Sequence, residues 1–222
     1  MIYDDELGER FEEEFGSVLD DARVYEQRCL NAQRWFGNAI LIVVDAALDS
    51  TGLGYFSVVS PRVSVFNEEY VEKEIVKSLA DLSKLSPDDR NLRAIMNNGR
   101  VWNVAIKVAG IIEKIRQEEN IESDIEALRY WAKSASYEGW KEDAIGRING
   151  VGLITFQYLR MQAGVDTSMP DKIIKRAIND LFGIATSDDI QFISAMEYLS
   201  EHIGHSQILI CWAIWLKMSD VK

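Results

Sequence analysis

The chain has 222 residues, 47% of them hydrophobic, and a formal net charge of -12, so it can bury one sizeable core or two small lobes. Its most apolar run, Ala39–Val44, is interrupted by Asp45 and is far shorter than the ~20 residues of a membrane span, so we expect no membrane partner. The N-terminus lacks a basic segment followed by an apolar one, and Cys29 and Cys211 show no pairing pattern, so we expect a cytoplasmic protein without disulfides.

Apolar residues recur at spacings of three and four, β-branched alternation is scarce and proline occurs three times. The sequence therefore predicts an all-α fold. In the N-terminal part, the predicted elements are an acidic helix over 4–15, a helix from the cap Ser17 to Phe36, a buried helix over 38–48, an irregular or extended segment over 55–66 and a helix over 67–83.

In the C-terminal part, glycines and capping residues divide the chain more finely. The predicted elements are a helix from Ser86 to Asn98, a helix over 102–118, a helix over 124–134 capped by Ser123, a helix that ends over 143–148, a turn over 149–152, a helix from Leu153 to Gly164, a helix that opens at Pro170-Asp171, and a last long helix or pair from Ser187.

Charge is distributed unevenly along the chain. Residues 1–30 hold ten acidic residues against three arginines, whereas residues 90–117 hold six basic residues against one glutamate. The net charge argues against a nucleic-acid ligand, because most such domains carry a basic surplus, but the second segment offers a local basic face. The alternative is that these charges are only the solvated sides of amphipathic helices.

A glycine-rich turn and an aspartate follow each other at a defined interval. The turn Ile148–Gly152 reads INGVG, and its two glycines permit another molecule to approach bare backbone. After a helix and a short loop, Asp171 opens the segment DKIIKRAI. This order resembles the helix-hairpin-helix DNA glycosylase superfamily, in which a hairpin of the type LPGVG precedes a Gly/Pro-rich loop and an aspartate. The resemblance covers about 92–216, with a looser match at 38–48.

The resemblance implies a two-lobed helical bundle of the HhH-GPD type, with lobes over about 67–165 and over 1–66 plus 166–222. It implies double-stranded DNA as the partner of a monomer that is associated with the nucleoid when it is on DNA. It also implies a sodium or potassium ion at the carbonyls of Ile148 and Gly150, with no other cofactor required. The iron-sulfur cysteines of some members are absent.

Asp171 matches the family's catalytic carboxylate. Cleavage of a glycosidic bond places positive charge on the sugar, and a nearby carboxylate can stabilise that charge and orient the attacking water. Near a helix N-terminus the ionised form is favoured by ~0.3–1 kcal/mol. The alternative is that Asp171 only caps its helix.

The hairpin residues expected to contact the DNA backbone are Asn149, Gly150, Val151, Gly152 and Ile154. Amide groups at such a turn and at the start of the next helix can point at one phosphate oxygen. The residues expected to add positive charge are Arg100, Lys107, Lys172 and Lys175. The alternative is that the motif is only a turn between helices.

Three positions depart from the family pattern. Members that also cleave the DNA backbone carry a lysine at the place of Ile154, so we expect no Schiff-base lyase activity. Asn149 replaces the usual proline. Ile173 replaces a histidine beside the aspartate, and a more buried Asp171 would have a raised pKa.

A flipped-out base needs a pocket of aromatic and amide groups. The candidate residues are Trp35, Tyr55, Phe56, Trp102, Trp140 and Tyr158, with Gln33, Asn38 and Asp45 as polar partners. Asp45 stands out because it interrupts an apolar run, and it either is satisfied by caps or faces the cleft between the lobes. We weigh three functions: a monofunctional DNA glycosylase, an inactive DNA-binding protein of the same fold, and an acidic helical module that binds protein partners.

Overall fold

A computed structural model describes residues 5–218, and within this range every regular element is helical. The α-helices are α1 (Asp5–Phe15), α2 (Leu19–Leu30), α3 (Ala39–Asp49), α4 (Ser60–Phe66), α5 (Leu79–Leu82), α6 (Arg90–Ile95), α7 (Gly99–Glu118), α8 (Asp124–Ser134), α9 (Leu153–Gln162), α10 (Lys172–Phe182), α11 (Asp189–Ile203) and α12 (Gln207–Met218). Short 3₁₀ or π turns lie at Gly16–Val18, Arg34–Gly37, Tyr55–Val59 and Asn67–Val71. The predicted all-α class is thus confirmed.

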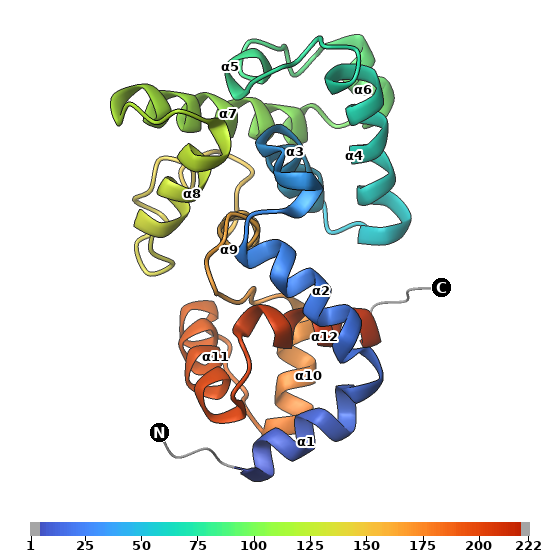
Figure 1. Cartoon of the computed structure of the whole chain (residues 1–222), viewed down its shortest axis with the longest axis vertical. Helices are drawn as coiled ribbons and strands as arrows, with labels where there is room; N and C mark the ends of the chain where they lie inside the picture. The colour runs from blue at the N-terminus through green and yellow to red at the C-terminus, as the bar shows by residue number, and fades with distance from the viewer. Residues whose placement is uncertain (1–4, 219–222) are drawn as a thin grey trace.

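The helices form two groups (Figure 1). One contains α3 to α8, with α3 packed chiefly on α7, and the other contains α1, α2, α10, α11 and α12, with α2 packed chiefly on α12. α9 contacts α2, α3 and α8, so it joins the groups. α3 packs on α7 and α4 packs on α3 and α6, so segment 39–66 lies with α7, whereas the predicted division grouped it with the terminal helices.

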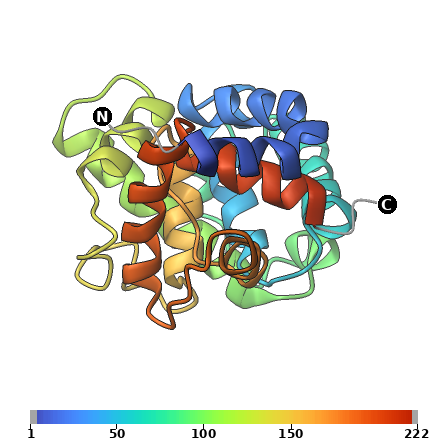
Figure 2. The same cartoon turned by 90° about the horizontal axis from the view of Figure 1, so that it is seen from below.

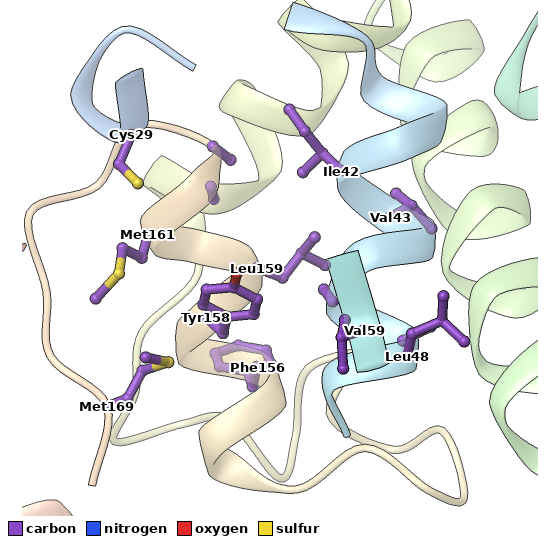
Figure 3. Packing of buried hydrophobic residues seen from close by; sticks show 14 of the residues in the cluster. Cys29, Ile42, Val43, Leu48, Val59, Phe156, Tyr158, Leu159, Met161 and Met169 are labelled. Carbon is purple, nitrogen blue, oxygen red and sulfur yellow. The ribbon is translucent and has the colours of Figure 1, made fainter. Parts of the chain in front are cut away.

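Two almost wholly buried helices meet at the centre of the molecule (Figure 3). α3 is apolar nearly all round, and its residues Ala39–Leu48 are buried. Asn38 caps this helix, because its side-chain oxygen accepts hydrogen bonds from the amides of Ile40 and Leu41 at 2.9 and 3.3 Å. α9 is buried along its length apart from Ile154, which is 38% exposed. Polar groups on these helices therefore need partners inside the protein.

The terminal group encloses its own core. α1 packs on α10, α11 and α12 (Figure 2), and its Phe11 and Phe15 are buried. The acidic helix predicted over 4–15 is thus present as Asp5–Phe15, and Asp4 lies outside the described residues. Cys29 and Cys211 are buried and not bonded to each other. None of the helices over 5–218 is long and apolar enough to cross a membrane.

The segment 55–83 differs from the prediction. Residues 55–66 were expected to be irregular or extended, but they form a π turn followed by α4, in which Val63 and Phe66 are buried. The predicted helix over 67–83 is instead one π turn, a loop and the four-residue helix α5. Glu74 adopts a left-handed conformation (φ +56°), which ends the first turn.

The helix that was predicted to reach Phe36 ends at Leu30. Ala32, Trp35 and Phe36 have φ angles of +52°, +50° and +58°, a left-handed conformation that costs non-glycine residues energy. Phe36 is 97% exposed. Strain of this kind persists where the surrounding structure fixes it, and it is common at ligand-binding sites.

The segment before the hairpin is also different, because 137–152 forms successive turns instead of a helix that ends at Ile148. Asp143 anchors these turns: its Oδ1 accepts from the amide of Ile145 at 2.7 Å, and the Trp131 indole donates to its Oδ2 at 3.2 Å. A Cβ on Gly146 would lie 1.7 Å from the Trp140 carbonyl oxygen, so the chain passes there only with glycine.

Candidate functional site

Asp171 is held at the start of α10. Its Oδ1 accepts from the amide of Ile174 at 2.8 Å, and its Oδ2 accepts from the indole Nε1 of Trp215 on α12 at 2.6 Å. Burial raises the pKa of Asp171, and the amide of Ile174, the indole of Trp215 and the amide of Ile173 oppose that rise. Asp171 as a whole residue is half-buried. A carboxylate oxygen can accept more than one hydrogen bond.

Aromatic rings connect Asp171 to a buried polar cluster. The ring centroid of Trp215 lies 6.3 Å from that of Tyr55 and 6.0 Å from that of Tyr158. Both tyrosine hydroxyls are directed at Asp45 on α3. The aspartate after the hairpin and the aspartate of the apolar helix therefore belong to one neighbourhood, although 126 positions separate them in the sequence.

Asp45 is fully buried, and its oxygens are used unequally. Its Oδ2 accepts from four donors: Trp35 Nε1 at 2.8 Å, Tyr55 Oη at 3.1 Å, Gln162 Nε2 at 3.1 Å and Tyr158 Oη at 3.4 Å. Its Oδ1 has no partner among the described residues. Burial raises the pKa of Asp45 against the opposing effects of Arg34 and these donors. Because Oδ2 is saturated with donors, a proton on this carboxyl would lie on Oδ1.

Arg34 is the counter-ion of Asp45. Its Nη2 lies 3.8 Å from Asp45 Oδ2 and donates to the hydroxyl of Tyr55. The guanidinium also lies over the rings of Tyr25 and Trp212, 5.3 Å from each centroid, at a distance typical of cation–π contacts. Arg34 is only 7% exposed, so the ion pair is buried.

Asp49 stands one turn after Asp45 on α3. Burial, with the nearby charges of Asp45 and Asp171, raises its pKa to about 8. Sequence reasoning missed this residue, although its spacing of four from Asp45 places both carboxyls on one helical face. Three acidic side chains with raised pKa values thus converge here, as is common at functional sites.

The raised pKa of Asp49 predicts a dependence of stability on pH. A carboxyl with a folded pKa of about 8 and an unfolded value near 3.8 contributes its full stability below pH 3.8 and loses it as pH rises through 8. Asp49→Asn should therefore raise the free energy of unfolding at pH 8.5 by about 2 kcal/mol, allowing for solvent screening of a partly exposed group. At pH 4 the variant and the wild type should differ little. Urea unfolding at both pH values measures the difference, and an equal effect at both would contradict the assignment.

A pocket opens beside the cluster, between α2, the strained segment at Phe36 and the turn before α4. Its volume is about 250 Å³, and its lining residues are Tyr25, Arg28, Gln33, Arg34, Trp35, Phe36, Tyr55, Phe56 and Ser60. Four of the predicted pocket residues, Gln33, Trp35, Tyr55 and Phe56, are thus brought together. Asp45 and Tyr158 lie beneath Tyr55 and do not line the pocket. Asp171 does not line it either.

The two remaining tryptophan candidates lie elsewhere. Trp102 is a fully buried core residue of α7 that packs on Phe66, and its indole donates to the Met96 carbonyl at 2.9 Å. Trp140 belongs to the turns before the hairpin and packs near Phe156. Neither lines the pocket: Trp102 fills the core, and Trp140 is half-buried in the turns before the hairpin.

The hairpin packs against the start of α7. Gly150 has φ +111°, and a Cβ there would lie 2.9 Å from both Arg100 Nε and Val104 Cγ2. Arg100, 50 residues earlier in the sequence, therefore lies directly at the hairpin. Asn149 and Gly152 are exposed, Val151 is buried, and Gly152 precedes the first turn of α9. The bare backbone and the arginine form one exposed corner.

This geometry makes Gly150 sensitive to substitution. Gly150→Ala should lower the free energy of unfolding by about 1–3 kcal/mol, because it forces an unfavourable φ angle and two close contacts. Gly152→Ala is the matched control, because its Cβ would meet nothing within 4 Å and its φ of -104° suits alanine. Thermal unfolding of both variants gives the comparison. Equal losses would contradict the packing of Arg100 on Gly150.

The predicted positive residues differ in their surroundings. Arg100, Lys107 and Lys172 are exposed and make no ion pair with a described residue. Lys175 pairs with Asp189 at 2.8 Å and lines a separate pocket between α10 and α11. Elsewhere on the basic segment, Arg116 is neutralised by Glu113 at 2.7 Å. The local basic face is therefore smaller than the sequence count indicated.

The cation implied by the resemblance requires free carbonyl oxygens at the hairpin. The Ile148 carbonyl accepts from the amide of Val151 at 2.9 Å, which closes the turn, and a carbonyl oxygen has a second lone pair. The residues thus fit a weakly held monovalent ion without requiring one. Over residues 5–218, no group of three or more His, Cys, Asp or Glu side chains is arranged for a metal.

Comparison with models of known protein families, with curated proteins and with solved structures gave no match for this chain.

Proposed function

We propose that this chain is a monofunctional DNA glycosylase of the helix-hairpin-helix type, which hydrolyses the N-glycosidic bond of a base flipped out of duplex DNA. The observation that supports it best is the placement of Asp171. Its carboxyl, at a helix start and with an N–H donor on each oxygen, is held in a fixed orientation by Trp215, whose ring lies 6.3 Å from that of Tyr55 in the wall of the aromatic pocket.

In the proposed reaction, Asp171 stabilises the positive charge that grows on the deoxyribose as the bond to the base breaks. Its second lone pairs are available to orient the attacking water. Amides of the exposed residues Asn149 and Gly152 and the side chain of Arg100 bind a phosphate on the same strand, which fixes register without reading sequence. Lys107 and Lys172 add charge along the backbone.

The reaction is tested with duplexes that carry uracil, mismatched thymine, alkylated purines or 8-oxoguanine, followed by alkali. We expect strand breaks after alkali only, because Ile154 occupies the position of the lyase lysine. Borohydride should trap no covalent complex for the same reason. Breaks on none of the lesions would overturn the glycosylase.

One observation favours a second candidate, a DNA-binding protein of the same type that does not catalyse. Asp171 lines neither of the two pockets described here, and both of its oxygens already have donors. Such a protein would bind duplex with an affinity that falls steeply as salt rises, because bound phosphates release counterions. It would release no base. Salt-independent binding would exclude both candidates and favour a protein-binding module.

The hydrogen bond from Trp215 predicts a shift in the pH profile. The ionised form of Asp171 is the reactive one, and burial raises its pKa, so the rate of base release should increase as pH rises through that pKa. Trp215→Phe removes a donor to the carboxylate and should move this increase to higher pH, by about one unit. Trp140→Phe is the control. An unchanged profile in Trp215→Phe would contradict the role of this hydrogen bond.

A further inference from the structure

The outer side of α2 carries an ordered stripe of exposed side chains (Figure 1). Asp20, Val24 and Arg28 follow one another at intervals of four residues, and Val24 is 48% exposed. This spacing places the three side chains on one side of the helix, about one turn apart. Neither charged residue pairs with an opposite charge among the described residues. Opposite charges without ion-pair partners thus lie at equal distances on either side of an exposed apolar residue.

An exposed aromatic ring extends this stripe beyond the end of the helix. Phe36 is 97% exposed, and it borders the same pocket as Tyr25 and Arg28. Its backbone is left-handed, with φ +58°, and the preceding Trp35 is anchored by a hydrogen bond to the buried Asp45 at 2.8 Å. Strained conformations that the surrounding structure fixes are common at contact sites. A ring that is held in water in this way is suited to contact with another molecule.

The charge of α2 differs from the charge of the whole chain. The formal net charge of -12 makes two copies repel each other at most of their surface. The exposed charges of α2, in contrast, are two acidic residues and two arginines, and they cancel: Asp20, Asp21, Arg23 and Arg28. The outer side of α2 is therefore a place where two copies can approach without net repulsion.

The order of the side chains on the stripe is symmetric. A contact between two identical copies across a two-fold axis needs a surface that is complementary to itself. If a second α2 runs antiparallel to the first with the axis at Val24, Asp20 of each helix faces Arg28 of the other, because both lie four residues from Val24. The apolar side chains of the two Val24 residues then meet at the centre, where contact removes them from water.

We propose that the chain forms a symmetric dimer through α2, with Val24 at the two-fold axis and Asp20 of each copy paired with Arg28 of the other. Because Phe36 and Arg28 border one pocket, the same contact brings Phe36 of each copy to the first turn of the other copy's α2. One helix and one loop make a small interface, so the dimer is weak. The inference differs from the monomer that the resemblance implies, and it does not depend on the proposed function.

Sedimentation equilibrium of the full chain measures the association directly. In about 0.15 M salt, which screens the long-range repulsion between the copies, we expect a monomer–dimer equilibrium with a Kd of about 10–100 µM, as suits a small contact. A chain that remains monomeric at about 500 µM would overturn the proposal.

Charge reversal tests the assigned surface. Arg28→Glu and Asp20→Lys each replace two attractive pairs by two repulsive ones, so each should weaken the dimer at least about tenfold. Lys133→Glu on α8 is the matched control, because it changes the net charge as Arg28→Glu does at an exposed position away from α2. It should leave the Kd within about twofold of the wild-type value. Equal weakening in Arg28→Glu and Lys133→Glu would overturn the assignment to α2.

Mixing the two charge variants tests the antiparallel pairing. In a mixed dimer, one end keeps the original Asp20–Arg28 pair and the other end pairs the introduced lysine with the introduced glutamate. An equimolar mixture should therefore associate within about threefold of the wild-type Kd, although each variant alone does not. A misfolded variant would not be rescued in this way. A mixture that stays as weak as the separate variants would overturn the proposed symmetry.

Phe36→Asn tests the contribution of the exposed ring. Asparagine tolerates the left-handed conformation, so the free energy of unfolding should not fall, whereas the dimer should weaken about threefold or more. An unchanged Kd would contradict the placement of Phe36 in the contact. None of these measurements uses DNA, so a failure of the glycosylase assay would leave their outcome unaffected, and a monomeric chain that excises a base would overturn this inference alone.

Discussion

Replacing Asp171 with asparagine is expected to lower the rate of base release by about 10²–10⁴-fold, the range that proton transfer by a positioned side chain contributes. Asparagine removes the negative charge that faces the sugar, but its side-chain oxygen can still cap α10 through the amide of Ile174, because asparagine is as good a cap as aspartate. The free energy of unfolding should therefore change little. Single-turnover cleavage of the preferred lesion and urea unfolding give the two measurements.

A matched control comes from the next helix. Asp188 caps α11 in the same way as Asp171 caps α10, by accepting from the amide of Gln191 at 2.9 Å, and it is exposed. Asp188→Asn makes the same chemical change at a helix start outside the candidate site. It should leave the rate of base release unchanged. If both variants lose activity equally, or if Asp171→Asn remains fully active, Asp171 is only a cap.

The sequence predicted those parts of the fold that depend on local chemistry. α8 begins after Ser123, the predicted cap, whose side chain accepts from the amide of Glu126, and α3 begins after Asn38, where the buried helix was predicted to start. α7, by contrast, begins at Gly99 and is capped by Asn98, three residues before the predicted start at Trp102. Such caps can be read from three or four consecutive residues. The opening of α10 at Asp171 is predictable for the same reason.

Other parts depend on contacts that are distant in sequence. Ala32, Trp35 and Phe36 adopt a left-handed conformation, but none of them is a glycine or an asparagine, the residues that usually indicate it. The helix predicted from the sequence therefore continued six residues beyond Leu30, where α2 ends. The indole of Trp35, which donates to Asp45, helps to fix this conformation. The turns over 137–152 could have been suspected from Gly139 and Gly146, since glycines close together disfavour a helix.

The candidate site shows the same division. Asp45 was singled out because it interrupts an apolar run, and Trp35, Tyr55 and Phe56 because base pockets need aromatic residues, yet only the folded chain brings them together with Arg34. No local pattern marks Arg34 as the buried counter-ion, because it follows an exposed stretch of α2 and its burial depends on Trp212 of the last α-helix. The ion pair is therefore a property of the tertiary structure.

Breaking this ion pair is expected to have the largest effect on stability. Arg34→Met keeps much of the apolar stem but leaves Asp45 buried without a counter-ion, which should lower the free energy of unfolding by about 3–5 kcal/mol at pH 8. Without Arg34 the pKa of Asp45 rises further, because Arg34 is the largest influence that opposes the effect of burial. A carboxyl with a raised pKa in the folded state lowers the free energy of unfolding of the protein as pH rises, so the cost of the substitution should be smaller at pH 5 than at pH 8.

Urea unfolding at both pH values tests this, with Arg28→Met as a control that should cost no more than about 0.5 kcal/mol at an exposed position. A cost that does not change with pH would mean that Arg34 acts through packing on Tyr25 and Trp212 rather than through its charge.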